Sequence, residues 1–267
     1  MKKILTLIVI TAATAFGASA QQLWTSAEFK MPVTKKITAG VEAEYRTTDR
    51  LSSTERWTIN ASVAYRMKSY LKFDAGYKYI NDYRGDEFST KMRDITEHPK
   101  KPYRHYYTPG YQLRRHRAYI SVTGSVKAGK LSISLRERYQ FTHRIGKDYT
   151  RYYINSSLPS HDFTKDDFMT SGTTQERIKE ARDKHSLRSR VEAEYTFSKK
   201  CRFKPYASIE MYNTLNEKFS SDKTRYTAGC SYKINPHNSI DLFYRFVREY
   251  EGSTNINVIG VGYCFKL

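Results

Sequence analysis

The chain has 267 residues, and its 46 lysines and arginines against 27 aspartates and glutamates give a formal net charge of +19. Only 39% of the residues are hydrophobic, and no stretch beyond the N-terminus approaches the roughly 18 consecutive apolar residues of a transmembrane helix, which excludes a helical membrane protein. Three cysteines leave at least one without a disulfide partner, so the fold does not depend on a disulfide framework.

The N-terminal residues 1–20 read MKKILTLIVITAATAFGASA, with two lysines, an apolar run over Ile4–Ile10 and small residues at 18–20. This order predicts a signal peptide that is cleaved before Gln21. The apolar run is too short for the alternative, a spanning N-terminal anchor. Loss of the two lysines lowers the net charge from +19 to +17. Export argues against nucleic acid as a partner and favours outer-membrane lipid and lipopolysaccharide.

Period-two alternation recurs through the rest of the chain. From Trp57 to Met67 every second residue is apolar, and the same pattern returns from Leu71 to Tyr79 after a short turn. Such alternation predicts strands with one apolar and one polar face. We expect strands at 22–31, 36–46, 55–67, 70–81, 115–127, 130–143, 186–198, 202–213, 223–234, 239–249 and 256–267. At about 10–14 residues these can cross a bilayer, whereas the alternative, a soluble β-sandwich, uses strands of about 5–6.

The connections between these strands alternate in length. Short turns fall at 32–35, 68–69, 128–129, 198–200 and 235–238, and longer links at 47–54, 82–114, 144–185, 214–222 and 250–255. Outer-membrane barrels have short periplasmic turns and long outer loops. The predicted fold is therefore an all-β, transmembrane antiparallel barrel of about 10–12 strands, with residues 21–267 as one domain in the cell outer membrane. Eleven segments are counted, although bacterial barrels use even numbers, so the strand parity stays open.

The last predicted strand alternates to the end of the chain, through Ile259, Val261, Tyr263, Phe265 and Leu267. A terminal strand with an aromatic residue near its end is typical of chains that the outer-membrane assembly machinery inserts. The aromatic residue here is third from the end, a slight departure from that pattern.

Several segments resemble a known family. They are LWTSAEFK, KKITAGVEAEYR, the ERW at 55–57, YLKFDAGYKYI and RERYQFTHR. Together they resemble the domain of unknown function 2490 family over roughly residues 22–267. The resemblance implies an outer-membrane barrel of the kind found in Bacteroidetes. It implies no reaction and brings no catalytic residues.

Charged residues of both signs share the polar face of the predicted strands. The expected lumen-facing set is Glu42, Glu44, Arg46, Arg56, Lys72, Asp74, Arg136, Arg138, Arg188, Arg190, Glu192, Glu194 and Arg245. Two interpretations stay open. The set forms an ion-paired packing that satisfies a narrow polar interior, or it lines a narrow, porin-like channel whose arginine excess favours anions. The sequence VEAEY occurs at 41–45 and 191–195, in strands predicted to run in opposite directions, so it does not mark a duplicated unit.

Enzymatic function finds little support in the sequence. Glutamates two residues apart on any strand lie about 7 Å apart, so their spacing does not specify acid–base catalysis. An outer-membrane lipid hydrolase would need a serine and a histidine in a motif that neither Ser160-His161 nor His237-Asn238-Ser239 matches. We predict a non-enzyme without cofactor or metal. A lipid- or lipopolysaccharide-modifying enzyme and a surface receptor or adhesin remain the alternatives.

The link at 82–114 is rich in cations and tyrosines. Candidate contacts to anionic glycans are Lys100, Lys101, Arg104, Arg114, Arg115 and Arg117. The alternative is a basic loop that is only solvated. His98, His105 and His116 lie in the same region without the spacing of a metal site. Glu137 has the outward parity of its strand, which predicts a local bulge or a short lipid-facing band there.

Overall fold

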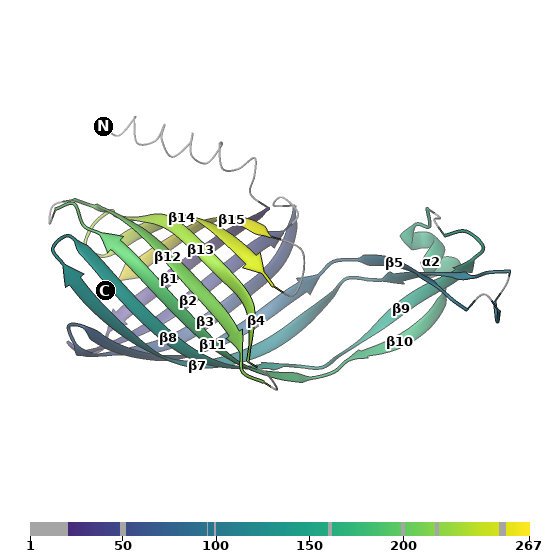
Figure 1. Cartoon of the computed structure of the whole chain (residues 1–267), viewed down its shortest axis with the longest axis horizontal. Coiled ribbons are helices and arrows are strands. Elements are labelled where there is room, and N and C mark those ends of the chain that lie inside the picture. Colours follow the sequence, from purple (N-terminus) through teal and green to yellow (C-terminus); the bar gives the residue numbers. More distant parts are fainter. Residues whose placement is uncertain are drawn as a thin grey trace, which may run out of the picture. The chain divides into compact units, whose positions relative to one another are not determined.

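The computed structural model describes residues 21–48, 52–94, 96–98, 100–159, 162–198, 201–216, 219–250 and 255–267. The predicted signal peptide, residues 1–20, lies outside this range. The chain forms two compact units (Figure 1). Unit 1 comprises residues up to Ile80, Arg115–His143 and Asp183–Leu267, and unit 2 comprises Asn81–Arg114 and Arg144–Arg182. The prediction of a single barrel domain did not anticipate the second unit.

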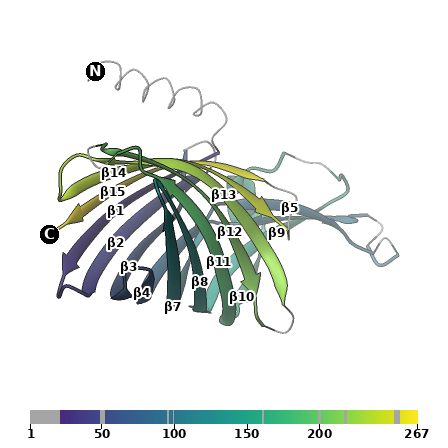
Figure 2. The ribbon, with the colours of Figure 1, turned by 60° about the vertical axis from the view of Figure 1, so that its left-hand side comes forward.

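Unit 1 is built on a closed barrel of eleven strands, in the order β1-β15-β14-β13-β12-β11-β8-β7-β4-β3-β2 (Figures 1 and 2). The strands are β1 (Gln22–Pro32), β2 (Ile37–Thr48), β3 (Ser53–Lys68), β4 (Leu71–Arg84), β7 (Tyr111–Ala128), β8 (Leu131–Arg144), β11 (Arg182–Tyr195), β12 (Phe203–Thr214), β13 (Ser220–Lys233), β14 (Asn238–Glu249) and β15 (Ile256–Lys266). All eleven predicted strands are present, within a few residues of the expected bounds. The predicted all-β barrel is confirmed.

Alternating exposure distinguishes the outer face of a barrel strand from its inner face. In β3, Ile59, Val63 and Tyr65 are exposed, whereas Thr58 and Asn60, which flank Ile59 and point to the opposite face, are buried. This inverts the arrangement of a soluble protein, because apolar side chains stabilise a barrel when the outer solvent is hydrocarbon. The polar side chains of the other face fill the interior instead.

The seam between the first and last strands is parallel. Residues of β1 pair with β15 in register from Gln22↔Val258 to Lys30↔Lys266. The pairings of β1 with β2 and of β14 with β15 are antiparallel. An odd number of strands that follow one another up and down can close only through one parallel pair. The eleven segments counted in the sequence are therefore all full strands, and the parallel seam accounts for the odd count.

The parallel seam also fixes the ends of the barrel. Leu267 N–H donates to the Lys30 carbonyl at the end that carries the short turns 33–36, 69–70, 129–130, 196–202 and 234–237, which we call the short-turn rim. At the opposite rim, Leu23 N–H donates to Thr47 Oγ1. The described chain therefore begins at one rim and ends at the other.

Unit 2 contains a four-stranded sheet in the order β10-β9-β6-β5. Its strands are β5 (Glu87–Met92), β6 (Tyr103–Thr108), β9 (Lys147–Ser156) and β10 (Thr173–Lys179). The helix α2 (Lys165–Ser171) lies between β9 and β10 in the chain. The prediction that 82–114 and 144–185 are loops is wrong. Aromatic residues lie on both faces of these strands, as in YRHYYT of β6, so the apolar–polar alternation that identified the barrel strands is missing.

An aromatic core joins α2 to one face of this sheet. The Phe168 side chain is buried, with ring centroids 5.7 Å from Tyr107 and 6.0 Å from Phe88. Lys165 forms an ion pair with Asp86, and the hydrogen bond from the Lys165 side chain is the main cause that lowers the pKa of Asp86.

The described part of the chain contains no helix with the length and apolar character of a membrane span.

The parallel seam can be tested by cross-linking through the native Cys264, which pairs with Glu28 across β1 and β15. Paired residues on neighbouring strands lie about 5 Å apart, within the Cα separation that a disulfide allows. In a background with Cys201→Ser and Cys230→Ser, we expect Glu28→Cys to form a disulfide with Cys264 in the folded barrel. Non-reducing electrophoresis and peptide mass spectrometry would detect it.

The control is Ser26→Cys in the same background, because Ser26 pairs with Gly262, two positions from Cys264. It should stay reduced. A disulfide from Ser26→Cys and none from Glu28→Cys would show that the seam has a different register, and the parallel closure described above would be wrong.

Candidate functional site

Three arginines surround one tryptophan inside the barrel. The guanidinium carbon of Arg46 lies 3.6 Å from the Trp24 ring centroid, and those of Arg225 and Arg245 lie 4.9 Å from it. These residues come from β1, β2, β13 and β14, so the contact spans the seam. Stacking on the negative face of an aromatic ring stabilises cations that are removed from water.

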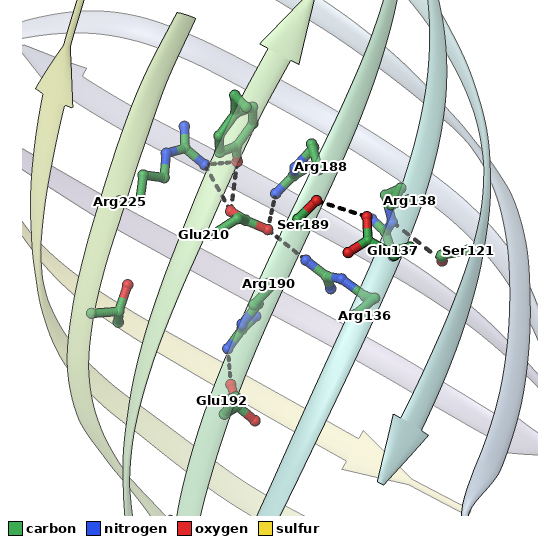
Figure 3. Close-up of polar contacts among 12 residues, drawn as sticks. Ser121, Arg136, Glu137, Arg138, Arg188, Ser189, Arg190, Glu192, Glu210 and Arg225 are labelled. Carbon is green, nitrogen blue, oxygen red and sulfur yellow. Dashed lines mark hydrogen bonds and ion pairs between the residues drawn. The ribbon is translucent and has the colours of Figure 1, made fainter. Parts of the chain in front are cut away.

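A second cluster forms around Glu210 on β12. Arg136 Nη2 donates to Glu210 Oε1 over 2.6 Å, Arg188 Nη2 donates to the same atom over 2.7 Å, and the Tyr212 hydroxyl donates to Oε2 over 2.7 Å (Figure 3). Arg225 lies 3.8 Å from Oε2. One carboxylate therefore contacts three guanidinium groups from β8, β11 and β13.

A third cluster forms around Asp74 on β4. Arg138 Nη2 donates to Asp74 Oδ1 over 2.9 Å, and its guanidinium group lies 4.0 Å from the Tyr119 ring centroid. With the Arg46–Glu44 pair at 2.7 Å, these clusters form one set that we call the arginine layer. Its members are Arg46, Arg136, Arg138, Arg188, Arg225 and Arg245, with Glu44, Asp74 and Glu210.

The carboxylates of the arginine layer are shielded from water. The Glu210 side chain is 8% exposed and that of Asp74 9%. Towards the short-turn rim, the Lys72 side chain is 45% exposed, and at the opposite rim that of Glu249 is 34% exposed. Lys72 and Glu249, near the two rims, are thus more exposed than the carboxylates of Glu210 and Asp74 in the layer. In this closed layer the Nε atoms of Arg136, Arg188 and Arg225 are buried without an acceptor among the described residues.

The predicted lumen residues point to the interior, and most are ion-paired. In the two VEAEY copies, Glu42 lies 3.7 Å from Lys78, and Glu194 lies 2.6 Å from Lys204. Glu44 and Glu192 pair with Arg46 and Arg190 of their own strands, and Arg56 pairs with Glu55 at 3.8 Å. The copies run in opposite directions, because β2 leaves a short turn and β11 ends at one. Each of the four carboxylates in the two copies therefore has a lysine or arginine partner.

Sequence reasoning missed three central residues, Trp24, Glu210 and Arg225. Each shares the inward parity of its strand, and that parity was the available signal. Only the closed barrel brings them together, since Trp24 and Arg225 are about 200 positions apart in the chain.

The six candidate glycan-contact residues do not form one surface. Lys100 and Lys101 are exposed between β5 and β6, and Arg104 lies on β6. Arg114, Arg115 and Arg117 belong to β7, and Arg117 Nε donates to Thr142 Oγ1 over 2.9 Å. The prediction of one basic loop is wrong because β7 begins four residues earlier than expected and β6 was not anticipated.

The histidines and serines singled out in the sequence are also separated. His105 is buried against Thr90 in unit 2, whereas the ring of His116 stacks beside Tyr77 on the outer face of the barrel. No group of three metal-ligating side chains occurs among the described residues. His237 Nδ1 contacts the Lys266 carbonyl, and Ser160-His161 lies outside the described residues.

Glu137 lies on the outer face of β8 without a bulge. Its neighbours Arg136 and Arg138 both point inward to their carboxylates, so the alternation is unbroken. Of the two predicted explanations, the local bulge is wrong and the short lipid-facing band stays a prediction. The Ser189 hydroxyl of β11 donates to Glu137 Oε2 over 2.7 Å (Figure 3). A polar pair therefore interrupts the apolar outer face between Leu135 and Tyr139, which are both exposed.

Comparison with known proteins places the chain in a family. The family "Protein of unknown function (DUF2490)" matches residues 21–257. The chain belongs to this family. A search of the curated proteins gave no match for this DUF2490 protein.

Solved structures of low sequence identity are similar to this DUF2490 chain. The beta domain of the Bordetella autotransporter BrkA matches with a TM-score of 0.50 and 9% identity, over 86% of this chain and 82% of that one. The translocator domain of autotransporter NalP from Neisseria meningitidis matches with a TM-score of 0.48 and 8% identity, over 85% and 73%. The Pseudomonas putida toluene transporter TodX matches with a TM-score of 0.44 and 9% identity, over 80% and 66%.

Glu210 should hold the arginine layer together. Glu210→Gln leaves three arginines around a neutral group, and breaking a buried charge pair costs about 3–5 kcal/mol. We therefore expect a lower free energy of unfolding in urea, measured in lipid vesicles. The control Glu194→Gln breaks an ion pair near the short-turn rim and should cost at most about 1 kcal/mol. Equal, small losses in both variants would show that Glu210 does not organise the layer.

The outward polar pair should lower the stability of the barrel in lipid. Because a carboxylate is unfavourable on a lipid-facing surface, Glu137→Leu with Ser189→Ala should raise the free energy of unfolding in vesicles by about 1–2 kcal/mol. The control Glu192→Leu removes an inward carboxylate paired with Arg190 and should lower it. A loss of stability from the outer double substitution would contradict a lipid-facing position for Glu137.

Proposed function

We propose that this protein is a narrow, anion-selective outer-membrane barrel that is closed at the arginine layer in the conformation described. The observation that supports this proposal most is the charge imbalance of that layer, in which six guanidinium groups face three carboxylates. A structural packing needs only enough cations to neutralise the carboxylates. The excess gives this layer a positive potential that attracts anions and repels cations.

The positions of the arginines favour a path that opens by side-chain movement. Arg245 has no carboxylate partner among the described residues and is held by Thr227 and the rings of Trp24 and Phe243. Contacts of this kind cost less to break than buried ion pairs. An entering anion would provide the negatively charged partner that Arg245 lacks. Charged side chains near both rims, such as Lys72 and Glu249, are more exposed than the layer and would be the first to meet an entering ion.

The proposal treats the protein as a non-enzyme without a cofactor. Outer-membrane lipid and lipopolysaccharide would surround the apolar outer face, and the assembly machinery would insert the barrel after removal of a signal peptide. The short-turn rim would then face the periplasm. The tyrosines and histidines on the outer face near the opposite rim, such as Tyr139 with His185 and Tyr77 with His116, suit a membrane–water boundary.

Planar-bilayer recording tests this proposal. We expect rare, small current steps from the wild-type protein and a reversal potential that favours anions in a salt gradient. Trp24→Ala removes the ring on which three arginines stack, so it should raise the single-channel conductance and keep the anion preference. Arg245→Gln in that background should reduce the preference, because it removes the arginine without a carboxylate partner.

The matched control is Lys204→Gln in the same Trp24→Ala background, which removes one positive charge from an ion pair near the short-turn rim. It should change the reversal potential less than Arg245→Gln does. Folding of each variant is checked by its shift in gel mobility on heating. A folded Trp24→Ala barrel that carries no current, or one that prefers cations, would overturn the proposal.

A further inference from the structure

We propose that one face of the four-stranded sheet in unit 2 is a binding surface for an acidic polysaccharide whose sugar rings carry carboxylates. The two faces of this sheet differ. One is covered by α2 through Phe168, Phe88 and Tyr107. The other, which we call the tyrosine–arginine face, carries Ser89, Lys91, Arg104, Tyr106, Lys147, Tyr149, Arg151, Tyr153, Asn155, Thr173, Gln175, Arg177 and Lys179, as the strand register shows. This inference is independent of whether the barrel conducts ions.

The centre of the tyrosine–arginine face pairs rings with cations. Tyr106 of β6 lies opposite Tyr153 of β9, with ring centroids 6.3 Å apart. The guanidinium carbon of Arg104 lies 4.2 Å from the Tyr153 ring centroid, and that of Arg151 lies 5.2 Å from the Tyr106 ring centroid. Two rings and two cations thus form a compact group across two neighbouring strands.

These arginines are held in place through one nitrogen only. Arg104 Nε donates to Asn155 Oδ1 over 2.8 Å, and Arg151 Nε donates to Thr108 Oγ1 over 3.2 Å. Within the described residues neither has a carboxylate partner. The terminal guanidinium nitrogens of both side chains therefore keep their donors for a ligand, in a geometry that suits the two oxygens of a carboxylate.

The charge of the face selects the class of ligand. Its four strands contribute six cations, namely Lys91, Arg104, Lys147, Arg151, Arg177 and Lys179, and one carboxylate at its end, Glu87. In contrast, the acidic residues Asp148 and Glu176 belong to the opposite face. A ligand with repeated negative charges matches this distribution, whereas a neutral glycan or an apolar peptide does not.

The alternation of rings and charges favours a sugar chain over a lipid headgroup. Along β9, Tyr149, Arg151 and Tyr153 follow one another at about 7 Å intervals on the same face. A polymer that carries one carboxylate per sugar ring can place rings against Tyr106 and Tyr153 while its carboxylates reach Arg104 and Arg151. A lipid headgroup concentrates its charge at one point and would use only part of this row.

The test measures binding of polygalacturonate to the full-length protein in detergent micelles by isothermal titration calorimetry, with neutral dextran as the comparison ligand. We expect polygalacturonate to bind, with an affinity that falls as salt screens the charges. Dextran should not bind. Arg104→Gln with Arg151→Gln should weaken binding about tenfold or more, because charge-assisted hydrogen bonds are lost. Tyr153→Leu should also weaken it, whereas Tyr153→Phe keeps the ring and should bind like the wild type.

The matched control is Lys100→Gln with Lys101→Gln, which removes the same charge from exposed residues of unit 2 outside this face. It should leave affinity within about twofold of the wild type if contact with the face decides binding. Near-ultraviolet circular dichroism checks that the aromatic core of unit 2 is intact in each variant. Equal weakening by both double substitutions, equal binding of dextran, or binding only to lipopolysaccharide vesicles or nucleic acid would each overturn the proposal.

Discussion

Closure of the barrel is the constraint on which the rest of this structure depends, because backbone groups left unpaired in hydrocarbon cost several kcal/mol each. Eleven strands that run alternately up and down can pair completely only if the first and last run in the same direction, and the register from Gln22↔Val258 to Lys30↔Lys266 meets that condition. The parallel seam places the two ends of the described chain at opposite rims. It also brings Trp24 of β1 beside arginines from β13 and β14, so the same closure that satisfies the backbone assembles part of the lumen.

A narrow closed barrel must then satisfy the charged side chains that point inward. Burying an ion is unfavourable unless other groups compensate it, and here two kinds of compensation are combined. Glu210 and Asp74 accept hydrogen bonds from arginines of other strands, and the rings of Trp24, Tyr119 and Tyr212 lie against guanidinium groups that the carboxylates alone could not balance. Aromatic rings thus allow more cations than carboxylates in the closed layer. That imbalance is the basis of the proposed anion preference.

The sheet of unit 2 lacks the apolar–polar alternation of the barrel strands. One of its faces is covered by α2, and both faces carry tyrosines. The buried Tyr107 and the partly exposed Tyr106 are adjacent in the sequence and lie on opposite faces. The chemical character of the residues in β6 does not show which face is covered, since tyrosine suits either environment. The strands were therefore mistaken for loops. Glu137 illustrates the reverse case: the sequence indicated its outward position, and the predicted bulge was unnecessary because Ser189 of the next strand supplies a hydrogen bond.

The sequence by itself determined the barrel, the positions of its strand segments, the direction of the two VEAEY copies and the inward position of most charged residues, whereas the odd strand count was settled by the parallel seam. It could do so because side chains alternate along a strand and the bilayer requires the outward set to be apolar. The pairing of β1 with β15, the cluster around Glu210 and the arginine stack on Trp24 were decided only by the tertiary structure. Each depends on which strands become neighbours when the barrel closes and on how far a long side chain reaches across an intervening strand. Alternation along one strand carries no information about either.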